Sequence, residues 1–177
     1  MTDVRIEHNF DCDENTFWER IFFAEPFNRQ MYLEHLKFKR WEVTDFRESD
    51  TSIHRTVSVM PTVGDLPGAI KSLIGDNLGY TEEGTYDKKL RRFRVKVVPS
   101  VLADKLSVRG EIWLQPQGTD RCKRIFDAQV SVKIFGVGSI IEKRLIADLQ
   151  LSYNAGAAFT TEYLKGLKSA TTEPKSC

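Results

Sequence analysis

The sequence predicts an α+β domain in which a curved antiparallel sheet wraps around one long C-terminal helix. Three observations lead to this fold class: a strand and two short helices come first, a series of strands follows, and a long amphipathic helix ends the chain. The length of 177 residues suits a single domain. We assign the domain to residues 1–168 and expect the polar tail 169–177 to be disordered.

The first strand is expected at 4–10, where apolar and polar residues alternate as in a half-buried strand. His8 falls on the apolar face of this strand, which makes it a candidate for a polar group in the interior. Acidic and amide residues then offer a helix cap. A first short helix is expected to end near Ala24, and a second to run from Pro26 to about Leu36.

The middle of the chain has the alternation and the turn residues of an antiparallel sheet. Strands are expected at 38–48, 51–60, 78–98 with a break near Gly84, 106–114 and 124–135, and a third short helix at 65–75. The alternation is clearest in the second of these strands, where His54 should point outward. The opposite face of that strand carries Ile53, Arg55, Val57 and Val59.

The C-terminal helix is expected at 138–167, and at 1.5 Å per residue it would be about 45 Å long. Its apolar residues recur at helical spacing and share one face, which we call the inner face. A stripe of this length needs a large apolar partner, and the predicted sheet supplies one. The inner face comprises Leu145, Ile146, Leu149, Tyr153, Gly156, Phe159, Tyr163, Leu164 and Leu167.

Composition and charge exclude several classes of protein. The net charge of +1 disfavours nucleic-acid binding by phosphate neutralisation. The sequence has no apolar run of about 18 residues and no visible secretory signal, so we expect a cytoplasmic protein. Cys12, Cys122 and Cys177 are far apart in the sequence and lack the spacing of metal ligands. We therefore expect neither a metal nor another cofactor, and we assign no catalytic residue because no catalytic motif occurs.

Two stretches carry a resemblance to a known superfamily. Residues 65–68 read Asp-Leu-Pro-Gly and are followed by Leu-Gly-Tyr-Thr-Glu-Glu at 78–83, and Phe-Gly-Val-Gly-Ser-Ile-Ile-Glu at 135–142 opens the last helix. Together with the order of elements, they resemble the SRPBCC or START-like superfamily, which has the helix-grip fold, and within it an uncharacterised, mainly bacterial branch. Ser139 departs from that branch, which tends to carry Lys there. The sterol-binding VASt branch is a second relative.

The resemblance implies a cavity between the sheet and the last helix that holds an apolar ligand. Some members of the superfamily are cyclases or hydratases and many are carriers, so the fold does not decide the activity. Three functions stay open. The chain could bind or transfer a lipid, a sterol or a similar hydrophobic molecule, or it could be a filled-core scaffold for protein interactions. It could also be a cyclase- or hydratase-type enzyme that uses His8, Arg55, Tyr153 or Glu142.

The expected ligand-binding residues lie on the strands and on the inner face of the last helix. An inward guanidinium at Arg55 should meet a carboxylate, for which Glu142 is one candidate, or backbone carbonyls or water. It could hold the anionic or hydroxylated head of a ligand, or it could form a structural ion pair or extend to solvent at the sheet rim. Gly156 leaves room either for a ligand or for a strand side chain. The full set is Arg55, Val57, Val59, Phe93, Val95, Glu142, Leu145, Leu149, Tyr153 and Gly156.

A basic cluster at 88–96 is the remaining candidate surface. Phe93 faces away from its charges, so the cluster lacks the stacking aromatic that a nucleic-acid site needs. It could contact an anionic membrane surface, or it could be a solvated sheet face paired with acidic neighbours. The basic residues considered for membrane contact are Lys88, Lys89, Arg92, Arg94 and Lys96.

Overall fold

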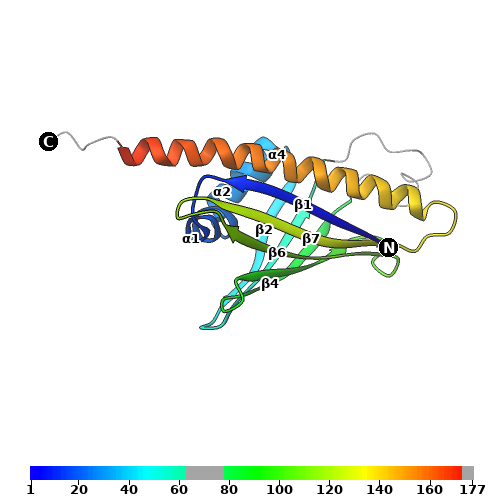
Figure 1. Ribbon diagram of the computed structural model, residues 1–177. Coiled ribbons are helices and arrows are strands. Elements are labelled where there is room, and N and C mark those ends of the chain that lie inside the picture. Colours follow the sequence, from blue (N-terminus) through cyan, green and yellow to red (C-terminus); the bar gives the residue numbers. More distant parts are fainter. Residues whose placement is uncertain (63–77, 173–177) are drawn as a thin grey trace.

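The computed structural model describes residues 1–62 and 78–172. Within them, seven strands form one antiparallel sheet in the order β1-β7-β6-β5-β4-β3-β2. The long helix α4 (Gly138–Thr172) runs across one side of this sheet, and the short N-terminal helices pack below it near one end (Figure 1). The curved sheet and the long C-terminal helix that the sequence predicts are both confirmed.

The N-terminal part contains the predicted strand and two short helical segments. Asp13 caps the first segment, because its Oδ1 accepts a hydrogen bond from the backbone N–H of Thr16 at 3.0 Å. Pro26 lies in the first turn of the second segment. Each segment begins as an α-helix and continues as a π-helix. The elements are β1 (Thr2–Phe10), α1 (Glu14–Thr16), η1 (Phe17–Phe22), α2 (Glu25–Arg29) and η2 (Gln30–His35).

The remaining strands form a meander whose neighbours in sequence are neighbours in the sheet. They are β2 (Arg40–Glu48), β3 (Ser52–Met60), β4 (Tyr80–Asp87), β5 (Arg92–Pro99), β6 (Leu106–Pro116) and β7 (Cys122–Val132). The first strand closes the order by pairing with the last one. The short helix predicted at 65–75 lies outside the described residues.

The predicted break near Gly84 is wrong. Gly84 lies inside β4, and the turn between β4 and β5 is at 88–91. The glycine is needed because the ring of Phe93 occupies the space beside it. A Cβ atom at Gly84 would be 1.9 Å from Cζ of Phe93.

The main core lies between the sheet, α4 and the N-terminal helices. The inner face of α4 is confirmed, because its apolar residues are buried in or packed against this core. Aromatic contacts hold the helix on both sides: Tyr153 stacks on Phe126 of β7 at 4.7 Å between ring centroids, and Tyr163 meets Phe27 of α2 at 4.9 Å. The helix also continues five residues beyond Leu167, so the first part of the expected tail is helical.

A smaller core cluster lies between η2 and strands β2 and β3. Its buried members are Trp41, Val57 and Val59. Tyr32 of η2 stacks on Trp41 at 5.6 Å between ring centroids. Within the part of the chain that the structure describes, no helix is both long and apolar enough to cross a membrane.

Candidate functional site

A group of polar side chains lies on the side of the sheet that faces the helices, among the apolar residues of the core. Strand alternation puts most of them there, because they share the faces of buried apolar residues in β3, β4 and β7. The others come from η2 and α4. We call this group the interior polar cluster, and it consists of Tyr32, Arg55, Tyr80, Glu82, Arg124 and Tyr153.

The inward orientation of Arg55 is confirmed, since its side chain is 7% exposed while His54 beside it is exposed. Its Nη1 donates a hydrogen bond to the backbone carbonyl of Phe22 at 2.7 Å. Its guanidinium lies over three aromatic rings, those of Phe22, Phe23 and Phe93, at 4.6, 5.4 and 5.5 Å from the ring centroids. This cage of π faces offsets part of the cost of burying the charge.

The expected partnership between Arg55 and Glu142 is wrong. Glu142 lies near the N-terminal end of α4, where it accepts hydrogen bonds from the hydroxyl of Thr2 and from the backbone N–H of Val132. The N-terminal amine also lies 3.5 Å from its carboxylate. Glu142 therefore connects the start of the chain to α4. The register of β1 explains this contact, because Thr2 pairs with Val130 near the end of β7 that precedes α4.

A second set of polar contacts connects Arg124 on β7 with His8 on β1 and Asn154 on α4. Nη2 of Arg124 donates to Nδ1 of His8 at 2.8 Å, and Nε2 of His8 lies 2.9 Å from Oδ1 of Asn154 on α4. Since a guanidinium only donates, His8 accepts at Nδ1 and donates from Nε2, which makes it the neutral tautomer. Burial, aided by the charge of Arg124, lowers the pKa of His8. The inward position predicted for His8 is confirmed.

The remaining members of the cluster are three tyrosines and one carboxyl group. Burial raises the pKa of Tyr32, Tyr80 and Tyr153, and the neighbouring charge of Glu82 adds to each shift. Burial also raises the pKa of Glu82, while the charge of Arg55 opposes this shift. None of these hydroxyl or carboxyl groups is hydrogen-bonded to another of the described residues. The cluster therefore presents unpaired donors and acceptors to the interior.

The apolar residues expected to bind ligand are divided between the two core clusters. Phe93, Val95, Leu145 and Leu149 belong to the main core, together with Tyr153 of the interior polar cluster. Val57 and Val59 are buried in the smaller cluster.

Gly156 is buried on the inner face of α4, but the side chain packed next to it does not come from a strand. The atom nearest to a Cβ built at Gly156 is Sδ of Met31, at 3.2 Å, and Met31 belongs to η2. A helix-to-helix contact thus explains the absence of a side chain at this position.

Sequence reasoning missed Tyr32, Tyr80, Glu82 and Arg124. Arg124 had a usable signal, because it alternates with buried apolar residues on β7. The wrong break at Gly84 hid the alternation that turns Tyr80 and Glu82 inward. Tyr32 had no comparable signal, since a π-helix does not follow the periodicity of an α-helix.

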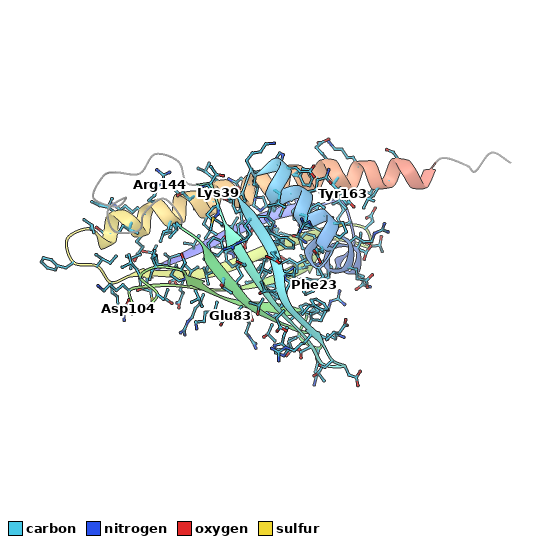
Figure 2. The ribbon with its side chains drawn as sticks, turned by 180° about the vertical axis from the view of Figure 1, so that it is seen from behind. Phe23, Lys39, Glu83, Asp104, Arg144 and Tyr163 are labelled. Atoms are coloured by element: carbon cyan, nitrogen blue, oxygen red, sulfur yellow. The ribbon has the colours of Figure 1, made fainter. Side chains whose placement is uncertain are left out.

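The basic cluster at 88–96 begins in the turn between β4 and β5 and continues along β5, where its basic residues lie on the opposite, outer face of the sheet. Most of its basic residues are paired. Arg92 and Arg94 both contact Glu111, at 2.6 and 3.1 Å. Lys96 lies 3.9 Å from Glu83, which points away from α4 (Figure 2). Lys88 binds a carboxylate as well, that of Glu48 at 2.6 Å. The alternative of a solvated sheet face with acidic partners is therefore what the structure shows. A shallow hollow of about 840 Å³ lies on this same face, next to Arg94, Lys96 and Glu111.

Two cysteines that are far apart in the sequence meet in the structure. Cys12 and Cys122 are both buried, and their thiols influence each other's protonation. This contact raises the pKa of Cys122 and lowers that of Cys12. Among the described residues, no three His, Cys, Asp or Glu side chains are grouped in a way that could hold a metal ion.

Comparison with known proteins gives a family and a fold. The model of a family described as "Protein of unknown function (DUF2505)" matches residues 6–164. No curated protein matches the sequence.

Solved structures resemble the chain over nearly its whole length. A protein of Thermus thermophilus, TTHA0849, has a TM-score of 0.65 and 15% identity, covering 94% of this chain and 99% of that one. The Zhui aromatase/cyclase of a Streptomyces species has a TM-score of 0.65 and 11% identity, covering 93% of each chain. A START superfamily protein of Mycobacterium smegmatis has a TM-score of 0.57 and 14% identity, covering 92% of this chain and 98% of that one. At such identities the likeness shows the fold, which is START-like, as the resemblance predicted.

Proposed function

The chain belongs to the DUF2505 family and has a START-like fold, and from these premises we propose that it binds a hydrophobic small molecule between the sheet and α4. The observation that carries the proposal is the interior polar cluster. Its hydroxyl and carboxyl groups lie in an apolar environment and lack hydrogen-bond partners among the described residues.

The physical argument concerns the cost of leaving polar groups unpaired. The tyrosines and Glu82 of the cluster are half-buried. A polar group withdrawn from water without a partner costs up to about 1–3 kcal/mol, so proteins rarely retain several of them without a use. A ligand site is one such use, since small-molecule sites combine an apolar lining with a few polar groups that orient the ligand. Phe93, Val95, Leu145 and Leu149 supply the apolar lining in this proposal.

The class of ligand follows from the same composition. The lining offers rings and branched aliphatic side chains, with hydroxyl groups spaced among them, so the ligand is a lipid, a sterol or a molecule of similar apolar character. A protein that binds such a molecule reversibly can act as its carrier. We do not extend the proposal to a membrane surface, because Lys88, Arg92, Arg94 and Lys96 already have carboxylate partners. Binding to anionic vesicles, abolished by Lys89→Glu, would reopen that question.

Two measurements test the proposal. Native mass spectrometry of gently purified protein should show a non-covalent adduct, and titration with the neutral hydrophobic dye Nile red should show saturable fluorescence. Val95→Phe places a ring on the inner face of β5, between Gly84 and Gly110, and should abolish dye binding while the domain stays folded. The matched control is Arg94→Phe, which places the same ring on the outer face of the same strand and should leave dye binding unchanged.

A filled core predicts different results. If side chains already occupied the space above Val95, the added ring would overpack it and destabilise the domain by about 1–3 kcal/mol. That outcome, together with the absence of an adduct and of dye binding, would contradict the proposal and favour the protein-interaction scaffold.

A second candidate function is a cyclase- or hydratase-type enzyme, and the raised pKa of Glu82 favours it. A carboxyl group with a raised pKa is better suited to act as a general acid, here beside Tyr80 and Tyr32, and the similar Streptomyces structure is an aromatase/cyclase. The test compares the molecules extracted from wild type and from Glu82→Gln. An enzyme would yield product from the wild type and unconverted substrate from the variant, the two differing by one water or one ring closure. Identical molecules would favour a carrier.

A further inference from the structure

We infer that the ligand carries an anionic head group, a carboxylate on an apolar body, and that Arg124 rather than Arg55 binds it. This inference rests on the proposed function, because it specifies the polar end of the same ligand. It starts from a difference between Arg124 and the other cationic side chains of the same strands.

Arg124 is half-buried and has no anionic partner among the described residues. Among the described residues, no carboxylate lies within 4 Å of its guanidinium, whose one hydrogen bond goes to His8. Its Nε is buried and has no acceptor. By contrast, Arg5 and Lys123 on the outer faces of β1 and β7 are each paired with a carboxylate. A charge that is partly withdrawn from water without a counter-ion is more costly than one with a carboxylate partner.

His8 cannot compensate the charge of Arg124. It accepts a hydrogen bond from Arg124, and its other ring nitrogen donates to Asn154, so it is neutral and contributes no charge. The rings of Tyr153 and Phe10 lie 4.8 and 5.4 Å from the guanidinium carbon and supply only a partial π contact. The surroundings of Arg124 therefore carry one uncompensated positive charge in an apolar setting.

Arg55 differs from Arg124 in how closely the protein encloses its side chain and in whether a carboxyl group lies near it. Three aromatic rings and a backbone carbonyl enclose Arg55, whereas the side chain of Arg124 is only half-buried. Arg55 also has a carboxyl group in its electrostatic range, that of Glu82, while the groups acting on Arg124 are Tyr153, Tyr32 and Cys122. Both arginines have a buried Nε without an acceptor, but the protein supplies Arg55 with a backbone carbonyl, three rings and a nearby carboxyl group. Arg124 lacks a carboxyl group of this kind and is left for an anion from outside.

The geometry around Arg124 suits a single carboxylate. Its free N–H groups can form charge-assisted hydrogen bonds, which are the strongest that a carboxylate makes. Tyr153 lies directly above the guanidinium and has a hydroxyl group that can donate a further bond. Phe126 and Leu114 flank this position and are buried and apolar, so the rest of the ligand must be apolar as well.

The experiment compares cis-parinaric acid with its methyl ester by fluorescence titration. The two probes share the same apolar chain and differ in the charge of the head group. Wild type should bind the acid about tenfold or more tightly than the ester. Arg124→Met should bind both probes with the affinity that wild type has for the ester. Arg109→Met removes an exposed arginine from the outer face of β6 and should behave as wild type.

Each further outcome has a defined meaning. Equal binding of acid and ester by wild type would overturn the inference and leave the proposed function standing, whereas binding of neither probe would overturn both. A preference for the acid that survives in Arg124→Met and is lost in Arg55→Met would reassign the head group to Arg55. If Arg124→Met does not fold, Arg124→Gln retains hydrogen bonding without charge, and it should also lose the preference for the acid.

Discussion

The interior of this domain has two regions that differ in how completely the chain packs them. At the end near η1, the aromatic region contains Phe17, Trp18, Phe22, Phe23 and Phe93, whose neighbouring rings lie 4.7–6.2 Å apart between centroids. The interior polar cluster, by contrast, has hydroxyl and carboxyl groups without hydrogen-bond partners among the described residues. The packed rings of the aromatic region stabilise the domain, whereas the unpaired groups of the interior polar cluster are available to another molecule.

The largest effect is expected from the aromatic region. Phe17 is 1% exposed and contacts Phe10 and Trp18, so Phe17→Ala should lower the free energy of unfolding by about 3–5 kcal/mol. Tyr153→Phe is the counterpart in the polar cluster. It removes a hydroxyl without a described partner and keeps the ring stacked on Phe126, so it should cost less than about 1 kcal/mol.

Urea denaturation followed by circular dichroism measures both variants. Similar losses of stability in Phe17→Ala and Tyr153→Phe would show that the two regions are packed alike. The contrast between them would then be wrong.

An intermediate effect is expected at Gly84, where the aromatic region meets β4. In Gly84→Ala the new methyl group would overlap the ring of Phe93, so the variant should lose about 1–3 kcal/mol of stability. Gly166→Ala is the control, because no atom lies within 4 Å of a Cβ built there and alanine favours a helix. That variant should gain up to about 1 kcal/mol. A neutral Gly84→Ala, measured by thermal unfolding, would mean that Phe93 moves freely.

The smallest effect concerns Glu82 and depends on pH. Burial raises its pKa above 4.5 in the folded state, with Arg55 opposing the shift, so the protonated carboxyl fits the fold better than the charged one. This contribution to stability is present below pH 4.5 and is lost as the pH rises through the raised pKa. Since glutamine resembles the protonated form, Glu82→Gln should raise the melting temperature by a few degrees at about pH 7 and by less at about pH 4.

Glu83→Gln is the matched control for this pH dependence. Glu83 is the next residue on β4, lies on the outer face, and is exposed beside Lys96. Its substitution should change stability by less than about 0.5 kcal/mol at either pH. A loss of stability in Glu82→Gln at about pH 7 would indicate that the charged carboxylate has a favourable partner and would remove Glu82 from the unpaired groups.

Local patterns predicted most of the fold. The alternation in β3 correctly placed Ile53, Arg55, Val57 and Val59 on one face, and helical spacing correctly gave the inner face of α4. These predictions succeed because burial of one face imposes a period of two on a strand and of 3.6 on an α-helix. Gly84 shows the limit of such patterns, since its role depends on the ring of Phe93, which belongs to another strand.

The candidate site was predicted less well than the fold. Arg55 and Tyr153 were expected inside and belong to the interior polar cluster, but the expected pairing of Arg55 with Glu142 does not exist. Glu142 and Arg55 carry opposite charges, yet no sequence signal tells which parts of a sheet and a helix come together. Arg124 had an alternation signal, but its importance lies in the absence of a nearby carboxylate, which only coordinates reveal.

The sequence by itself determined the order of the elements and the face that most of them bury. Those features follow from the periodicity of apolar residues and from turn and capping residues, which act within a few positions along the chain. The tertiary structure alone decided which polar groups meet inside and which of them lack partners. Arg124, His8, Asn154 and Tyr153 come from three elements distant in sequence, and only the packing of α4 across the sheet brings them together.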